Sequence, residues 1–177
     1  MHAYLYLRVE PGKLDDVVIQ LHGVHGVRAA AAVVGDWDAM AAVEGPDFRA
    51  IARAVIKEVH AIEGVTRAYT APVVPPDLLG VTAERIALPM HRGAREACYV
   101  HVSARAGQVG EVFEALAGSA EVSAVAVLAG QYDLLAELPT VWEHASRIIL
   151  ERIHPIPGVL ATNTLVGMPG IEDEPDG

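Results

Sequence analysis

Residues 35–38 read Gly-Asp-Trp-Asp and residues 130–133 read Gly-Gln-Tyr-Asp, so one G-x-[WY]-D pattern occurs twice, 95 residues apart. Matched residues continue on both sides of the pattern, which indicates two copies of one structural unit. The spacing falls to 94 after one residue is lost or gained between Glu44 and Val55. The matched pairs are Tyr4 and Tyr99, Gly12 and Gly107, Val17 and Val112, Leu21 and Leu116, His60 and His154, Ile62 and Ile156, Gly64 and Gly158, Val65 and Val159, and Thr70 and Thr164.

Each copy has a hydrophobic pattern that predicts the order strand, helix, strand, strand, helix, strand. Aliphatic side chains alternate with other types along residues 4–9, as in a strand. From Leu14 to Leu21 the apolar residues recur at i, i+3, i+4 and i+7, which is helical spacing. The expected strands are 4–9, 27–34, 39–44, 65–74, 99–103, 122–128, 132–138 and 159–168, and the expected helices are 14–21, 48–59, 109–116 and 141–153.

The repeated order predicts an α+β fold of tandem ferredoxin-like βαββαβ units, of the dimeric α/β-barrel type. Each unit should be a four-stranded antiparallel sheet with both helices on one face. Residues 29–34 have no polar side chain, so we expect this strand to be buried on both faces. The two sheets should then pack face to face, within one chain or by exchange between chains.

The expected domain limits follow from the repeat. Residues 1–74 form the first copy, 75–96 a linker, 97–168 the second copy and 169–177 an acidic tail. Within the linker, residues 81–88 are apolar enough for a short helix or strand.

Composition and motifs exclude several classes of protein. With 13 basic and 23 acidic residues the net charge is −10, which disfavours unaided binding to duplex DNA. The single cysteine, Cys98, excludes a disulfide framework and a Cys-rich zinc site. No apolar run approaches the ~20 residues of a membrane span, and no signal peptide is evident, so the default expectation is a cytoplasmic protein. The sequence has neither a nucleophile motif nor a phosphate-binding loop, so we expect no catalysis, no cofactor and no metal site.

The βαββαβ order with G-x-[WY]-D at the central hairpin resembles the effector-binding (RAM) domain of the Lrp/AsnC transcription regulators, over residues 3–74 and 97–168. Residues 156–159, with Thr162 and Thr164, are similar to the passage from the family's last helix to its last strand. The first copy has Ala68 where the second has Thr162. Family members usually carry an N-terminal helix-turn-helix, which we expect to be missing here because Met1 leads directly into the first strand.

The resemblance implies a non-enzymatic protein that senses an amino acid or related metabolite and takes part in Lrp/AsnC-type transcription regulation. It also implies a homo-oligomer, with full-length regulators of the family as candidate partners and with no direct contact to nucleic acid or membrane. The alternative is an enzyme of the dimeric α/β-barrel type, such as a cofactor-poor monooxygenase or a haem-binding protein, with Tyr6, Tyr99 and His101 facing the barrel interior. A third reading is a scaffold that joins full-length relatives into mixed oligomers.

Candidate ligand-binding residues lie at the two hairpins and on the last strand of each copy. Asp38 and Asp133 would accept hydrogen bonds from a ligand ammonium, or from backbone amides as in ordinary turns. Glycine at 35 and 130 permits positive φ and close backbone approach. The aromatic residues would wall a pocket or pack on a neighbour, and the threonines would donate to a carboxylate or serve as ordinary strand residues. The candidate set is Gly35, Asp36, Trp37, Asp38, Thr70, Gly130, Gln131, Tyr132, Asp133, Thr162 and Thr164, with the better site expected in the second copy.

The histidines favour structural interpretations. His60 and His154 are expected to sit where the second helix of each copy ends, at the negative end of the helix dipole. His22 and His25 flank a glycine and are expected in a surface turn, because a metal site needs three or four ligands.

Overall fold

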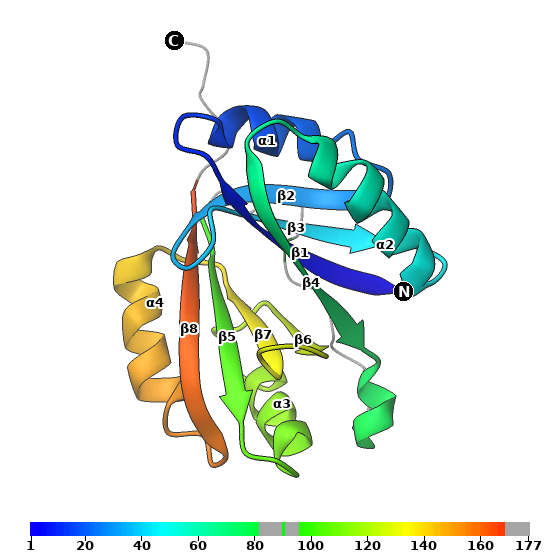
Figure 1. Ribbon diagram of the computed structural model, residues 1–177. Helices are drawn as coiled ribbons and strands as arrows, with labels where there is room; N and C mark the ends of the chain where they lie inside the picture. The colour runs from blue at the N-terminus through cyan, green and yellow to red at the C-terminus, as the bar shows by residue number, and fades with distance from the viewer. Residues whose placement is uncertain (82–89, 91–95, 169–177) are drawn as a thin grey trace. The chain divides into compact units, whose positions relative to one another are not determined.

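The computed structural model describes residues 1–81, 90 and 96–168 (Figure 1). The chain divides into two compact units, which are described separately below. Unit 1 comprises Met1–Pro72 and Gly167–Gly177, and unit 2 comprises Val73–Val166. The short element expected at 81–88 lies outside the described residues except for Val81, and so does the tail at 169–177.

Unit 1 is a four-stranded antiparallel sheet in the order β4-β1-β3-β2. Two helices, α1 and α2, lie on one side of these strands (Figure 1). Its elements are β1 (His2–Val9), α1 (Leu14–Leu21), β2 (Val27–Val34), β3 (Ala39–Glu44), α2 (Phe48–Lys57), the 3-10 turn η1 (Val59–Ala61) and β4 (Val65–Val74).

The helix-covered face of unit 1 forms an aliphatic core. Leu5 and Leu7 of β1 pack with Val17 of α1 and Ile51 of α2 in one buried cluster. Helix α2 starts at the predicted residue, Phe48, and Asp47 caps it, because the Asp47 carboxylate accepts a 2.8 Å hydrogen bond from the N–H of Ala50. Since Leu5 and Leu7 face the helices, the alternating residues of β1 face the opposite, helix-free side of the sheet.

Unit 2 repeats the plan, with the strand order β8-β5-β7-β6. The last two residues of β4 also belong to this unit, where Val73 pairs with Leu128 and Val74 with Val127. Its other elements are the 3-10 helix η2 (Pro76–Leu79), β5 (Cys98–Ala104), α3 (Val109–Ala117), β6 (Ala124–Leu128), β7 (Leu134–Leu138), α4 (Trp142–Ile148), the π-helix η3 (Ile149–Ile153) and β8 (Val159–Gly167).

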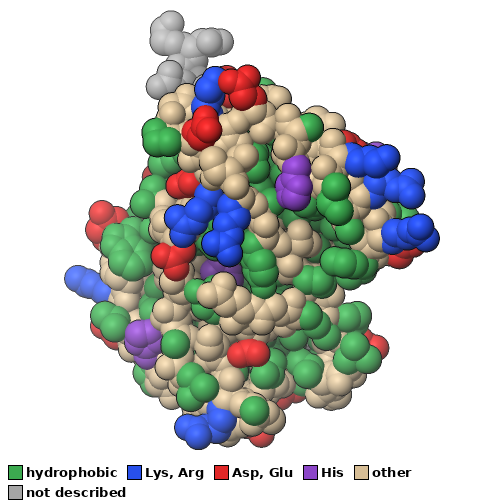
Figure 2. All heavy atoms as spheres, in the orientation of Figure 1, with side chains coloured by type: hydrophobic (Ala, Val, Ile, Leu, Met, Phe, Trp, Pro, Cys, Tyr) green, Lys and Arg blue, Asp and Glu red, His purple; other side chains and the backbone are tan. Residues whose placement is uncertain are grey.

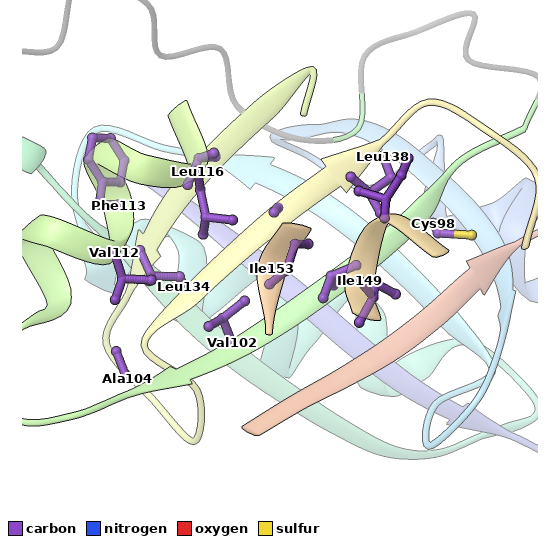
Figure 3. Close-up of a cluster of buried hydrophobic side chains, with 14 of the residues drawn as sticks. Cys98, Val102, Ala104, Val112, Phe113, Leu116, Leu134, Leu138, Ile149 and Ile153 are labelled. Atoms are coloured by element: carbon purple, nitrogen blue, oxygen red, sulfur yellow. The ribbon is translucent and has the colours of Figure 1, made fainter. Parts of the chain in front are cut away.

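The core of unit 2 lies between its sheet and the helices α3, α4 and η3 (Figure 3). Val102 of β5 and Leu134 of β7 face Phe113 of α3 and Ile153 of η3 in this cluster, and all four side chains are buried. Both units therefore have the expected fold class, an α+β arrangement of ferredoxin-like βαββαβ units with antiparallel strands.

Two expectations about strands were wrong in detail. Strand β2 is not buried on both faces: of its residues only Ala29 and Val33 are buried, and Val34 is 57% exposed. The residues between Ala29 and Val33 are alanines, whose small side chains cover little of the strand backbone. The hairpin strands of unit 2 begin two residues later than expected. For β7 the reason is that Leu128 N–H bonds to the Asp133 carbonyl at 2.8 Å, which places Asp133 in the turn.

The described residues include no helix with the length and apolar character that crossing a membrane requires. The packing of the two sheets face to face stays a prediction.

Candidate functional site

The strand register divides the predicted site residues between the two faces of each sheet. Thr70 pairs with Leu5, and in unit 2 Thr164 pairs with Val100 and Thr162 with Val102. Direct partners across a ladder share one face, so all three threonines lie on the helix-covered face. The hairpin aromatic residues instead contact side chains on the helix-free face, as the distances below show.

Thr162 has a partner on the helix-covered face. Its Oγ1 lies 2.8 Å from Nε2 of His154, the residue that follows η3. His154 was expected to meet the helix end only through the dipole, and this contact also joins it to the last strand. The equivalent position in unit 1 is Ala68, which has no hydroxyl group.

Asp38 and Asp133 make the same backbone contacts in the two units. One carboxylate oxygen of Asp38 accepts a 2.8 Å bond from the N–H of Val9, and Asp133 accepts a 2.8 Å bond from Ala104 N–H. In both units the ladder with the last strand shifts register at this point, between Arg8 and Val9 and between Ser103 and Ala104. In each unit one carboxylate oxygen therefore accepts from a backbone N–H at the point where the sheet is irregular. This contact corresponds to the interpretation of the aspartates as turn residues, and it uses one of the two carboxylate oxygens.

The remaining hairpin residues are solvent-exposed. Gly35 and Asp36 in unit 1, and Gly130 and Gln131 in unit 2, are all exposed. Gly35 has the positive φ that was expected, +148°, whereas Gly130 does not have a positive φ. The two turns thus differ in backbone conformation although their sequences match.

The helix-free face of unit 1 carries an aromatic cluster, the Trp37 cluster, made of Tyr6, Trp37 and Tyr69. Tyr6 and Tyr69 are partners across β1 and β4, with ring centroids 6.0 Å apart. Trp37 lies 6.1 Å from each of the two tyrosine rings and is nearly parallel to Tyr69, at 17°. Offset aromatic contacts of this kind are favourable and hold the hairpin against the sheet.

Two arginines extend the Trp37 cluster. The guanidinium carbon of Arg8 is 5.5 Å from the centre of the Trp37 ring, and that of Arg67 is 5.8 Å away. Both distances are within the range of a cation–π interaction. Basic side chains gather beside the β2–β3 hairpin in Figure 2, with acidic ones next to them. The hairpin end of unit 1 therefore combines a flat aromatic surface with two positive charges.

Unit 2 has a polar counterpart on its helix-free face. His101 takes the place of Tyr6 and packs against Tyr132, with ring centroids 4.8 Å apart. His101 pairs across the ladder with Asn163, which stands where unit 1 has Tyr69. His101 is only 2% exposed. The two copies thus share a hairpin aromatic residue but differ in what it contacts.

A second buried polar group lies farther along the same face of unit 2. Glu137 is 2% exposed, and its two carboxylate oxygens accept bonds from the N–H of Met90 at 2.7 Å and from the hydroxyl of Ser123 at 2.8 Å. Tyr99 is its partner across β5 and β7, and burial together with the charge of Glu137 raises the pKa of that phenol. Tyr99 therefore stays protonated at any physiological pH.

Five residues described above were not singled out from sequence: Arg8, Arg67, Tyr69, Glu137 and Asn163. The alternation of β1 places Arg8 on the face of Tyr6, and the same period in β4 places Arg67 with Tyr69. The missing information was the register between β1 and β4, which joins strands almost sixty residues apart. By contrast Tyr6, Tyr99 and His101 were named from sequence, under the enzyme alternative, as residues that face a barrel interior, and the structure has them on the helix-free faces of their units.

The residues considered for metal binding and the single cysteine lie in other parts of the surface and core. Among residues 1–81, 90 and 96–168 no group of three or more His, Cys, Asp or Glu side chains is placed to hold a metal ion. His22 and His25 are exposed. Cys98 is buried, and its burial, with the nearby charge of Glu143, raises the pKa of the thiol to about 11. So little thiolate forms near neutral pH that Cys98 is an inert core residue.

Comparisons with known proteins agree with the internal repeat. A family model described as the Lrp/AsnC ligand binding domain matches residues 2–75 and again residues 97–175. A search of curated proteins finds no match.

Solved structures show similarity to one copy or to both. The siroheme decarboxylase NirDL is 12% identical with a TM-score of 0.68, and the alignment covers 94% of this chain and 71% of that one. FFRP-DM1 is 28% identical with a TM-score of 0.38, covering 40% of this chain and 96% of that one. AsnC of E. coli is 17% identical with a TM-score of 0.38, covering 67% and 70%. At 12% identity, the likeness to NirDL shows the fold alone.

Proposed function

From the premise that the chain belongs to the family of Lrp/AsnC ligand-binding domains, we propose that it is a non-enzymatic binding protein in Lrp/AsnC-type transcription regulation. Its ligand is an amino acid or a related small metabolite, and it works as a homo-oligomer. Full-length regulators of the family are candidate partners, because they would supply the basic DNA-binding surface that a chain of net charge −10 lacks.

The observation that carries this proposal is the repeated contact of the hairpin with the helix-free face. Trp37 lies against Tyr6 in unit 1, and Tyr132 lies against His101 in unit 2. An aromatic wall beside polar groups at a strand end is the kind of lining that small-molecule sites use.

The hairpin carboxylates supply the charge that a ligand ammonium needs. Asp38 and Asp133 each use one oxygen for a backbone N–H, and a carboxylate can accept on both oxygens. Backbone N–H groups around Gly35 and Gly130, in exposed turns, would donate to a ligand carboxylate. Thr70, Thr162 and Thr164 stand on the helix-covered faces, so a ligand would reach them only from that side.

A thermal-shift screen against the twenty amino acids and their common derivatives tests the proposal. A ligand at ~100 times its Kd stabilises the folded state by about 2.7 kcal/mol. For a chain of this length that is a rise in Tm of about 5–11 °C. Light scattering after gel filtration, with and without the best ligand, reports the oligomer. If no compound raises Tm and the protein is a monomer throughout, the proposal fails.

A second candidate function is an enzyme of the dimeric α/β-barrel type. The observation in its favour is that His101 and Glu137, the two buried polar or charged residues of the described part of the chain, share the helix-free face of unit 2. An imidazole is the ligand type that haem iron commonly takes. The absorption spectrum after haem is added separates the two functions: a Soret band that is lost in His101→Ala favours the enzyme.

A further inference from the structure

Arg8 and Arg67 stand directly opposite each other on neighbouring strands of unit 1. Like charges in this position repel and destabilise the pair of strands. The ion pairs of the described residues involve other side chains, and the guanidinium groups of both arginines lie within cation–π distance of the ring of Trp37. Both arginines are exposed. Two cations therefore converge on one ring, and neither forms an ion pair with a carboxylate of the residues that the structure describes.

The fold does not require this arrangement. In unit 2 the Cα partners at the equivalent register are Ser103 and Ala161, and the sheet there has the same strand order and the same register shift. The internal repeat thus supplies a built-in comparison: one copy forms with a neutral pair, and the other carries two of the chain's 13 basic residues at the same place. A pair of like charges that only one copy carries, and that the fold does not need, points to binding.

We propose that Arg8 and Arg67, oriented by Trp37, form an oxyanion-binding site in unit 1, which takes the carboxylate or phosphate group of a small metabolite. A guanidinium presents a planar fork of N–H donors that matches two oxygens of such a group. The ring of Trp37 restrains both side chains, so less side-chain freedom is lost on binding. The site goes beyond the function proposed above, because it needs no ammonium on the ligand.

Trp37 is also the reporter for the test. The chain has two tryptophans, and the other is Trp142 at the start of α4 in unit 2. In a Trp142→Phe background the tryptophan fluorescence, excited selectively over that of tyrosine, therefore comes from Trp37 alone. Inorganic phosphate and succinate are titrated separately at constant ionic strength set with sodium chloride, and calorimetry provides an affinity that does not depend on the emission of Trp37.

The expected result is a saturable change with at least one of the two anions. Arg8→Gln and Arg67→Gln should each weaken binding about 10-fold or more, the loss expected for one charge-assisted contact. The matched control is Arg53→Gln on α2, which removes the same charge from an exposed residue of the helical layer and should leave the affinity unchanged. The variants should fold, and their Tm should change little, because each loses a cation–π contact with Trp37 but also removes the repulsion between the two arginines.

The phosphate and succinate titrations show which anionic group binds, and together with the amino-acid screen they distinguish this proposal from the proposed function. Saturation by phosphate alone assigns a phosphate ester, and saturation by succinate alone assigns a carboxylic acid. The absence of saturation by either, or an equal loss in Arg53→Gln, overturns the site. If amino acids stabilise the protein while both anions fail, only this site falls. If an anion saturates while no amino acid raises Tm, the site stands and the amino-acid assignment falls.

Discussion

Replacing Asp38 by alanine should destabilise unit 1 whether or not a ligand binds there. The carboxylate accepts a 2.8 Å hydrogen bond from Val9 N–H, in a partly buried position where the ladder between β1 and β4 shifts register. A hydrogen bond to a charged group contributes about 1.5–3 kcal/mol. For a chain of this length, that loss lowers Tm by about 3–12 °C. Asp133→Ala should have a similar effect on unit 2, because its bond to Ala104 N–H has the same length.

Asparagine at the same position separates folding from binding. Its amide oxygen still accepts from the backbone N–H but carries no charge, so Asp38→Asn should lose about half as much stability as Asp38→Ala. If the carboxylate also holds a ligand ammonium, Asp38→Asn should weaken ligand binding by about 10- to 150-fold while the protein remains folded.

Urea denaturation followed by circular dichroism gives the change in the free energy of unfolding, and calorimetric titration gives the affinity. A single-site effect appears as a shift in midpoint at constant slope. The reasoning would be refuted if both alanine variants unfolded within about 0.5 kcal/mol of the parent, the range usual for surface substitutions. Unchanged affinity in both asparagine variants would show that the carboxylates serve the turns only.

Three further predictions concern the core, one turn and nucleic acid. The pKa of Cys98 is raised from 9.0 to about 11, so its contribution to stability is intact below pH 9 and is lost as pH rises through about 11. Two pKa units correspond to about 2.7 kcal/mol, and urea midpoints at pH 8 and pH 11 should show a smaller fall in Cys98→Ala than in the parent. Gly26→Ala should lower the free energy of unfolding by clearly more than the about 1–2 kcal/mol of a left-handed residue, because the new Cβ would collide with the carbonyl oxygen of Glu44. The control is Gly12→Ala, which has a similar φ and open space around it. Equal melting temperatures of the two variants would contradict the prediction. The protein alone should not shift duplex DNA in a gel at physiological salt, given its net charge of −10, and tight salt-sensitive binding would overturn this expectation.

Much of the fold was predictable because the helices and strands of each copy have recognisable local sequence patterns. The local pattern predicted α1 and β3 with the bounds that the structure has, and it placed the start of α2 correctly at Phe48, directly after the Asp47 cap. The one-residue change in repeat spacing falls where a chain tolerates it, between the end of the hairpin and the N-cap of the second helix, at Asp47 in unit 1 and Val141 in unit 2.

The residues that make up the candidate site were less predictable, because they depend on which face of its strand each residue occupies and on the register between strands far apart in sequence. Tyr69 and Thr70 are neighbours in sequence, but they lie on opposite faces of β4, and a shift of one residue would exchange them. No local pattern shows that Tyr69 meets Tyr6. The backbone role of Asp38 was one of two open readings, since the bond to Val9 depends on a register shift that sequence does not reveal.

Joining the two copies in one polypeptide frees each from the symmetry of a dimer. In a two-fold homodimer built from single copies, every substitution appears twice, so a pair of arginines on one sheet would be repeated on the other. Here Arg8 and Arg67 can exist while Ser103 and Ala161 stand at the matching positions. The chain therefore carries two unlike copies in a fixed one-to-one ratio, and if the proposed site of unit 1 binds an anion, titration should saturate at one equivalent per chain.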